Sequence, residues 1–128
     1  MASVTPRLLF VEDEVLIQIL AEEDLKTEGF DVVVAGSAKA ALEAVRPGIE
    51  TFAAAIIDIG LPDRGGDTLA ADFRSISAEL PIVIVSGYDQ GILGSRFAGD
   101  PRVTFLRKPY RSPQLIAALA LVNVVAGK

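Results

Sequence analysis

The sequence predicts an α/β fold in which a parallel β-sheet is covered by helices on both faces. Short apolar runs alternate five times with longer segments, most of which carry apolar residues at helical spacing. The runs are continuous rather than alternating, as in VVVA, AAAII and IVIV, which is typical of strands buried on both sides. With 128 residues and no linker or repeat, the chain suits one domain with a full core and right-handed crossovers.

The first βα unit begins with LLFV at residues 8–11, which we interpret as a buried strand. A helix is expected from residue 14 to about 28, and Gly29 follows it as a stop signal. DVVVA at residues 31–35 is the second predicted strand. The helix is predicted from apolar residues at helical spacing, namely Val15, Leu16, Ile19, Leu20 and Leu25.

The middle of the chain is expected to contain the second helix, the third strand and the third helix. Ser37 can cap a helix that continues to about Arg46, where Pro47-Gly48 ends it. AAAIID at residues 53–58 is the third strand, and a helix from about residue 66 to 77 follows it.

The last part of the chain supplies two further strands and two helices. PIVIVS at residues 81–86 is the fourth strand, and a helix interrupted by glycines is expected at about 90–98. VTFLRK at residues 103–108 is the fifth strand. Ser112-Pro113 provides a cap and then a proline at the first helical position, so the last helix should run from there to about Val125.

The last helix is apolar over most of its circumference. One stripe, near Leu115, Leu119 and Val122, must pack on the sheet. A surface helix normally needs one apolar face, so a second stripe indicates either a partner or homodimer surface or a wide core face. The second stripe consists of Ile116, Ala120 and Val124.

Composition and charge exclude several classes of function. The net charge of −5 argues against a nucleic-acid or anionic-membrane partner, because both need basic patches. The chain has no Cys and no His, which excludes disulfides, a Ser-His-Asp triad and a histidine-bound zinc. No apolar run approaches the ~20 residues of a membrane span, and the N-terminal run is too short for a signal peptide. We therefore expect a cytoplasmic protein.

Chemically active side chains follow four of the predicted strands. Glu12 and Asp13 follow the first, Asp58 ends the third, Ser86 ends the fourth and Lys108 ends the fifth. Ligands of open parallel sheets bind beyond these carboxyl ends. Three converging carboxylates repel one another unless some are protonated or a cation lies among them, and Mg²⁺ prefers such oxygen ligands. Mg²⁺ and Lys108 together suit a phosphoryl group, with Asp58 as its nucleophile.

Taken with their neighbours, these residues resemble the receiver domain of bacterial two-component response regulators. The resemblance covers essentially the whole chain. It implies a flavodoxin-like, doubly wound (βα)5 fold with a five-stranded parallel sheet in the order 2-1-3-4-5. It also implies one receiver domain over residues 1–128, with a core from about 7 to 126 and no effector domain. The matching motifs are Glu12-Asp13, IIDIGLPDRGGD around Asp58, VIVSGY around Ser86, and Lys108-Pro109-Tyr110.

The resemblance implies that Asp58 is the phosphoacceptor and that Mg²⁺ is the cofactor. Glu12 and Asp13 would be the acidic pair that holds the metal, with Asp13 the more direct ligand. Asp58 and the backbone carbonyl of Gly60 would complete the protein's ligands. Asp13 could instead simply cap the first helix, which would give it a structural role and no part in binding the metal.

The resemblance also implies roles for residues after the fourth and fifth strands. Ser86 would bond the phosphoryl oxygen, Lys108 would pair with it, and the bond before Pro109 would be cis. Phe105 falls at the position of the aromatic switch, which would work together with Ser86. In isolation, Ser86 and Phe105 fit structural roles as well, and Lys108-Pro109 fits an exposed turn. Two further acids, Asp63 and Asp67, fit loop and cap positions better than ligand positions.

The predicted function is that of a single-domain response regulator. It would accept a phosphoryl group from a histidine kinase or phosphotransfer protein and signal to an unknown downstream protein by phosphorylation-dependent binding. Catalysis beyond self-phosphorylation and self-dephosphorylation is not expected. A receiver-like adaptor that signals by binding alone also fits the sequence.

Two more classes of protein fit the sequence less well. An aspartate-nucleophile phosphatase typically carries a second Asp where this chain has Gly60. A nucleotide- or flavin-binding module needs a Gly, Ser or Thr loop after the first strand, where this chain has Glu12-Asp13-Glu14.

Overall fold

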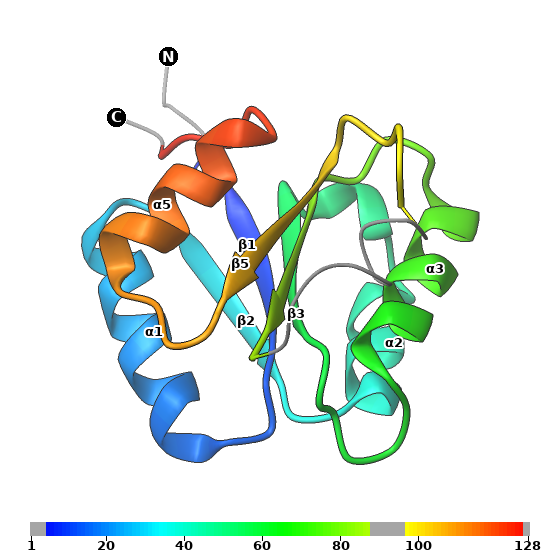
Figure 1. Cartoon of the computed structure of the whole chain (residues 1–128), viewed down its shortest axis with the longest axis horizontal. Helices are drawn as coiled ribbons and strands as arrows, with labels where there is room; N and C mark the ends of the chain where they lie inside the picture. Colours follow the sequence, from blue (N-terminus) through cyan, green and yellow to red (C-terminus); the bar gives the residue numbers. More distant parts are fainter. Residues whose placement is uncertain (1–4, 88–96, 127–128) are drawn as a thin grey trace.

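Five parallel strands form one sheet in the spatial order β2-β1-β3-β4-β5 (Figure 1). The structure is a computed structural model that describes residues 5–87 and 97–126. The predicted α/β fold and its strand order are confirmed, and each predicted strand lies within a residue of its observed bounds. The strands are β1 (Arg7–Val11), β2 (Asp31–Ala35), β3 (Ala54–Asp58), β4 (Ile82–Ser86) and β5 (Val103–Arg107).

The helices cover both faces of this sheet. Those in the described part of the chain are α1 (Val15–Thr27), α2 (Ala38–Val45), the 3-10 helix η1 (Ile49–Thr51), α3 (Gly66–Ile76) and α5 (Ser112–Leu121). Figure 1 shows α1 and α5 on one face and α2 and α3 on the other. Successive strand residues point to opposite faces, so β1 sends Leu9 into the core beside α2 and α3 and Leu8 into the core beside α1 and α5.

The strand register aligns the residues that matter at the carboxyl edge of the sheet. Val11 of β1 is level with Ile57 of β3, so the residues that follow them, Glu12 and Asp58, stand side by side. Asp58 is in turn level with Val85 of β4. Residues from three strands therefore meet at one edge because the strands are parallel and in this register.

Two predicted helix boundaries are confirmed by their hydrogen bonds. Gly29 ends α1 with a φ of 100°, a conformation that favours glycine, and the Phe30 N–H donates to the Leu25 carbonyl at 3.0 Å. Ser37 caps α2, since its Oγ accepts a hydrogen bond from the Ala40 N–H at 3.1 Å.

The predicted cap of the last helix was wrong by one residue. Arg111, rather than Ser112, is the N-cap of α5, and the Gln114 Oε1 accepts a hydrogen bond from the Arg111 N–H at 2.8 Å. Ser112 already lies within the helix, and its hydroxyl donates to the Asp24 carboxylate of α1. The interaction with Asp24 comes from a distant part of the chain, so local sequence could not show that it draws the Ser112 side chain away from a cap.

The last helix also ends earlier than predicted, at Leu121 instead of about Val125. Asn123 adopts a φ of 66°, and its N–H donates to the Ala120 carbonyl at 3.0 Å. The Val124 N–H donates to the Leu119 carbonyl at 2.9 Å. These two bonds are the pattern of a Schellman helix end, in which Asn replaces the usual Gly.

Helix α1 has an apolar face that points away from the core. The predicted helix is confirmed, but of the apolar residues that predicted it only Leu25 is buried. The inward face consists of Ile17, Ala21 and Leu25, spaced four residues apart. The exposed side chains, 53–68% accessible, are those of Val15, Leu16, Ile19 and Leu20.

The second apolar stripe of the last helix belongs mostly to the core. Val124 is buried, Ile116 is half-buried against the same core, and Ala120 is exposed. This arrangement favours the wide core face over a partner surface on that stripe. Leu121 and Val125 remain exposed beside it.

The expected fourth helix at residues 90–98 lies outside the described residues, apart from Phe97 and Ala98, which form a turn. Of the helices that the structure describes, none is both long and apolar enough to span a membrane.

Candidate functional site

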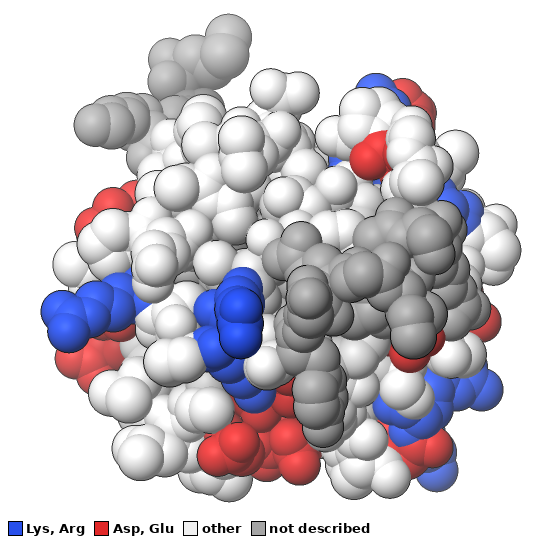
Figure 2. Space-filling view, in the orientation of Figure 1, with Lys and Arg blue, Asp and Glu red and all other residues white. Residues whose placement is uncertain are grey.

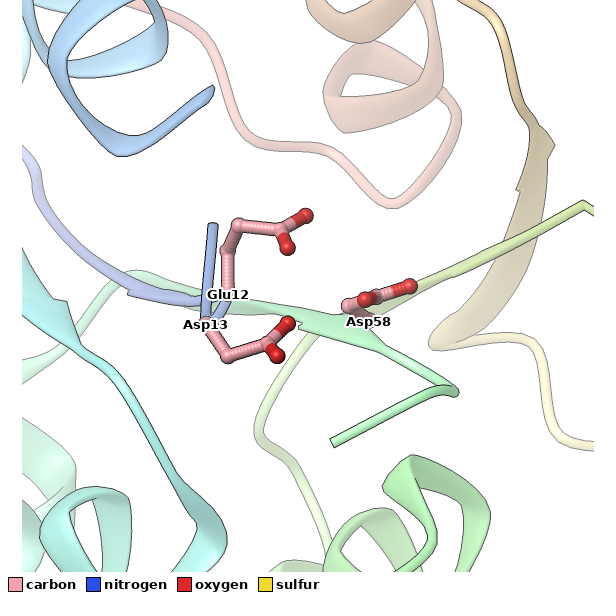
Figure 3. A group of neighbouring side chains, drawn as sticks. All are labelled: Glu12, Asp13 and Asp58. Carbon is pink, nitrogen blue, oxygen red and sulfur yellow. The ribbon is translucent and has the colours of Figure 1, made fainter. Parts of the chain in front are cut away.

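Three carboxylates gather at the carboxyl edge of the sheet. Glu12 and Asp13 follow β1, Asp58 is the last residue of β3, and an oxygen of each lies within 4.8 Å of the others (Figure 3). Glu12 and Asp58 are buried, with 1% and 7% of their surface exposed, whereas Asp13 is exposed. The Glu12 and Asp58 carboxylates are therefore shielded from water, whereas the Asp13 carboxylate faces solvent. A cation or protein that arrives from solvent meets Asp13 first.

Lys108 brings a positive charge between the two buried carboxylates. Its Nζ lies 3.2 Å from Asp58 Oδ1 and 3.3 Å from Glu12 Oε1. The Lys108 N–H donates to the Ser86 carbonyl at 2.9 Å, which fixes this residue at the end of β5. The Lys108–Pro109 peptide bond is cis, as the resemblance implies. In Figure 2, acidic and basic atoms lie next to each other at the lower edge of the molecule, where the strands of Figure 1 end.

Burial and neighbouring charges change the acidity of these groups. Burial raises the pKa of Glu12 and the Asp58 charge adds to this, against a hydrogen bond of 3.2 Å from the Glu14 N–H. Burial alone would lower the pKa of Lys108, but the Asp58 and Glu12 carboxylates outweigh it and raise the pKa. Burial also raises the pKa of Tyr110 to about 12, aided by the same two carboxylates. Lys108 thus stays charged and Tyr110 stays a neutral phenol.

The donor set fits a hard divalent cation. Three carboxylates face one ammonium, which leaves the site with excess negative charge. Gly60 lies beside the cluster, because a Cβ built on it would be 3.9 Å from Asp58 Oδ2. Carboxylate and carbonyl oxygens are the ligands that Mg²⁺ takes in proteins, usually with several waters retained. Glu12, Asp13, Asp58 and the Gly60 carbonyl are therefore suitable ligands.

The interpretation of Asp13 as a simple helix cap is wrong. The N-cap of α1 is Glu14, and its N–H is bound by the side chain of Glu12. A further residue supports this segment, since Gln18 Nε2 donates to the Glu12 carbonyl at 2.5 Å. Sequence reasoning missed Gln18 because a polar residue on a helix carries no sign of which loop it reaches.

Gly66 is a second residue that sequence reasoning missed. Its N–H donates to the Ile59 carbonyl at 3.0 Å, which closes the loop after Asp58. A Cβ at this position would lie 2.7 Å from the Asp58 carbonyl carbon and closer still to its oxygen, so only glycine fits. The first turn of α3 therefore packs directly against the backbone of Asp58. The Gly-Gly pair in the sequence was a signal for such a close approach.

Ser86 lies near the cluster, whereas Phe105 does not form part of it. Ser86 is buried at the end of β4, one residue beyond the residue level with Asp58. Among the residues that the structure describes, none comes within 4 Å of a Cβ placed on Gly87, the residue after Ser86. Phe105 is half-buried against the core beside α2 and α3, which agrees with its structural interpretation. Its role as a switch remains a prediction.

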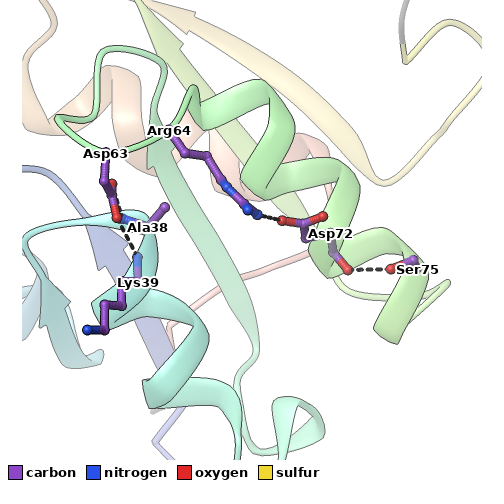
Figure 4. Close-up of polar contacts among 6 residues, drawn as sticks. All are labelled: Ala38, Lys39, Asp63, Arg64, Asp72 and Ser75. Carbon is purple, nitrogen blue, oxygen red and sulfur yellow. Dashed lines mark hydrogen bonds and ion pairs between the residues drawn. The ribbon is translucent and has the colours of Figure 1, made fainter.

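Asp63 and Asp67 lie where loop and cap residues were expected rather than among the ligands. Asp67 is in the first turn of α3. Asp63 binds the N-terminus of α2, and its oxygens accept hydrogen bonds from the Ala38 and Lys39 N–H groups at 2.9 Å each (Figure 4). The helix that Asp63 caps precedes it by 24 residues, so its partner could not be read from local sequence.

The fold and the site together define a receiver domain, a class of signalling domain built on a five-stranded parallel sheet. The chain belongs to the response regulator receiver domain family, which it matches over residues 8–120.

Curated relatives agree with this family. The chain is 39% identical over 87 residues to the sensor protein TorS of Escherichia coli K12, covering 68% of this chain and 9% of TorS. It is 31% identical over 121 residues to the transcriptional regulatory protein PdtaR of Mycobacterium tuberculosis H37Rv, covering 94% of this chain and 58% of PdtaR. The chain thus spans less than two thirds of either relative.

Solved structures agree as well. A response regulator receiver protein from Sinorhizobium medicae WSM419 has a TM-score of 0.80 and 30% identity, covering 93% of this chain and 95% of that one. The chemotaxis protein CheY4 of Vibrio cholerae has a TM-score of 0.84 and 21% identity, covering 93% and 99% of the two chains. The second likeness shows the fold alone.

Proposed function

We propose that the chain accepts a phosphoryl group on Asp58 from a histidine kinase or phosphotransfer protein. In this proposal, phosphorylation changes which downstream protein it binds. The observation that carries the proposal is the position of the Lys108 Nζ, within 3.3 Å of both Asp58 and Glu12 in a site where Asp13 adds a third carboxylate. We interpret this ammonium as a group that stabilises an incoming phosphoryl anion beside the nucleophilic carboxylate, rather than as one half of a purely structural ion pair.

The chain's own residues have separate tasks in this reaction. A carboxylate oxygen of Asp58 forms the new O–P bond while the P–N bond to the donor's imidazole breaks, and that nitrogen takes up a proton. Lys108 exchanges its contact with Asp58 for a phosphoryl oxygen, and the Ser86 hydroxyl donates to another. Glu12, Asp13, Asp58 and the Gly60 carbonyl would hold Mg²⁺. When bound, the metal supplies positive charge that screens the repulsion between the two anions.

The surface beside the site supports a protein as the donor. The exposed apolar side chains of α1 begin at Val15, two residues after Asp13. A cavity of about 590 Å³ lies between α1 and the segment after β5, and Leu20, Lys108 and Tyr110 are in its lining. Soluble monomers rarely expose contiguous apolar patches without a use in binding. Asp58 does not line this cavity, which favours a protein donor over a small-molecule phosphatase.

Several finer expectations belong to the same proposal. We propose that this receiver works in the cytoplasm and signals through contacts with other proteins. The net charge of −5 supports the expectation that nucleic acid is not its partner.

Incubation with Mg²⁺ and acetyl phosphate tests the function. Intact mass spectrometry should show one phosphoryl adduct on the unaltered protein and none on Asp58→Asn. Amide NMR with a beryllofluoride mimic should show shifts that reach Ser86 and Phe105. An adduct that persists in Asp58→Asn would contradict the phosphoacceptor. The absence of both adduct and Mg²⁺-dependent shifts would instead leave an adaptor that signals by binding alone.

A further inference from the structure

Asp63, in the loop between β3 and α3 (residues 59–65), makes two hydrogen bonds to the N-terminus of α2. Asp63 Oδ1 accepts a hydrogen bond from the Ala38 N–H and Oδ2 accepts one from the Lys39 N–H, each at 2.9 Å (Figure 4). Both N–H groups belong to the first turn of the helix, where backbone donors lack partners within the helix. The bond from Ala38, followed by that from Lys39, lowers the pKa of Asp63, so the side chain is a carboxylate.

The same loop carries a ligand of the proposed metal site. Gly60 lies three residues before Asp63, and only Leu61 and Pro62 separate them. Leu61 is buried in the core beside α2 and α3, and proline restricts the backbone at the next position. We therefore expect a displacement of Asp63 to reach Gly60, because the two residues between them, one buried and one a proline, leave the segment little freedom to absorb it.

The far end of the loop is fixed independently. The Gly66 N–H binds the Ile59 carbonyl, and Arg64 pairs with Asp72 of α3 (Figure 4). These contacts hold the loop to α3 and β3, but not to α2. Among the contacts of the described residues, those of Asp63 are the hydrogen bonds that join the loop to α2.

Asp63 and Ser37 bind different N–H groups at the N-terminus of α2. Helix α2 already has a cap, since Ser37 Oγ accepts a hydrogen bond from the Ala40 N–H at 3.1 Å. Ser37 acts within its own helix end and does not reach the loop. The chain thus offers two caps on one helix, of which only Asp63 connects the helix to the site.

We propose that Asp63 is a positioning residue, which holds the loop so that the Gly60 carbonyl can reach a metal shared with Asp58. This inference rests on the proposed function, because it assumes that Mg²⁺ binds at Glu12, Asp13 and Asp58. Coupling between two sites is reciprocal. Metal binding at Gly60 therefore also changes the hydrogen bonds that Asp63 makes with α2.

An NMR titration with Mg²⁺ tests this inference on the unaltered protein, Asp63→Ala, Asp63→Asn and Ser37→Ala. In the unaltered protein, the amides of Ala38 and Lys39 should shift with the same dissociation constant as that of Gly60. Asp63→Ala should weaken Mg²⁺ binding about 3- to 10-fold and abolish the shifts in α2, and Asp63→Asn, which keeps one acceptor, should fall between. Ser37→Ala should lower the melting temperature without changing Mg²⁺ affinity.

Repeating the Mg²⁺ titration at a higher salt concentration distinguishes a displaced metal ligand from the loss of the Asp63 charge. The loss of a negative charge would weaken Mg²⁺ binding by an effect that 0.5 M KCl screens, whereas a displaced ligand stays displaced. The difference between Asp63→Ala and the unaltered protein should therefore persist at high salt. Its disappearance, or equal Mg²⁺ affinities in the Asp63 and Ser37 variants, would overturn this inference alone. An unaltered protein that shows no Mg²⁺-dependent shift would overturn the proposed function as well.

Discussion

The central residue of the site is Lys108, which stands between two buried carboxylates. Its Nζ lies 3.2 Å from Asp58 and 3.3 Å from Glu12, so one ammonium offsets part of the repulsion between them. Asp13 adds a third acid within 4.8 Å. Burying charges costs more free energy than an imperfect set of partners returns. We therefore expect a bound cation to stabilise the folded protein.

Replacing Glu12 with Gln should make the metal-free protein more stable at neutral pH. Burial, together with the Asp58 charge, raises the pKa of Glu12 above 4.5, so folding favours its protonated form. This contribution is present below pH 4.5 and is lost as the pH rises through the higher folded-state pKa. Glu12→Gln, which stays neutral, should gain about 1 kcal/mol at pH 7 and almost nothing at pH 4.

Urea unfolding at both pH values, in EDTA and in Mg²⁺, measures this difference. Mg²⁺ should reverse the order at pH 7, because it stabilises the unaltered protein and binds the variant less tightly. A gain of equal size at pH 4 and pH 7 would show that the Glu12 charge is not its cause.

Gly66 should tolerate no side chain, because a Cβ there would press on the backbone of Asp58. Gly66→Ala should lower the free energy of unfolding by about 1–3 kcal/mol and slow phosphorylation of Asp58. Gly65→Ala is the matched control. Its Cβ would meet side-chain atoms rather than backbone, namely the Asp67 carboxylate at 2.5 Å and Thr68 Oγ1 at 3.9 Å, and the Asp67 side chain can move. Thermal melts and acetyl phosphate kinetics compare the two, and equal effects would contradict the close packing of α3 on Asp58.

At the scale of the element, α1 has two apolar faces, one in the core and one exposed. Its inward residues, Ala21 and Leu25, join the core with α5. Its outward residues include Leu16 and Leu20, which are 68% and 54% exposed although they are apolar. Helical periodicity correctly predicted the helix, but it could not tell which of two apolar faces is covered. The outward face begins next to the acidic edge, where the proposed protein donor would approach.

Leu16→Glu should therefore slow transfer from a phosphorylated histidine kinase at least about 10-fold and leave acetyl phosphate kinetics unchanged. Stability should stay within about 0.5 kcal/mol, because the side chain is largely in solvent. Leu121→Glu is the control, since Leu121 is 72% exposed on α5. Radiolabel transfer from a kinase that phosphorylates the unaltered protein provides the measurement. Equal loss in both variants would contradict a specific role of α1.

At the scale of the whole molecule, much of the fold could be predicted because its signals are local. Continuous apolar runs predicted buried parallel strands, and Gly29 and Ser37 marked helix boundaries that the structure confirms. The end of α5 was missed because Asn123 adopts a conformation that Gly more often supplies. Local sequence also could not show that Ser112 bonds to Asp24, 88 residues away.

The candidate site likewise contains some residues that could be predicted from local sequence and others that could not. Glu12, Asp13, Asp58 and Lys108 could be found because each lies at or just after the carboxyl end of a strand, and parallel strands bring these ends together. The supporting residues could not be found, since their partners depend on tertiary structure. Asp63 reaches a helix 24 residues earlier in the chain. The sequence therefore predicts the charged residues at the ends of the strands. The contacts that hold these residues in place can be seen only in the three-dimensional structure.

Chemical mapping of the phosphorylated residue tests the proposed phosphoacceptor most directly. Borohydride reduces an acyl phosphate on aspartate to homoserine, which mass spectrometry can locate in a peptide digest. After incubation with acetyl phosphate and Mg²⁺, homoserine should appear at position 58 and should be absent when EDTA replaces the metal. Homoserine at another acid, such as Asp13, or a stable phosphate on Ser86 without any change at Asp58, would contradict the proposed site.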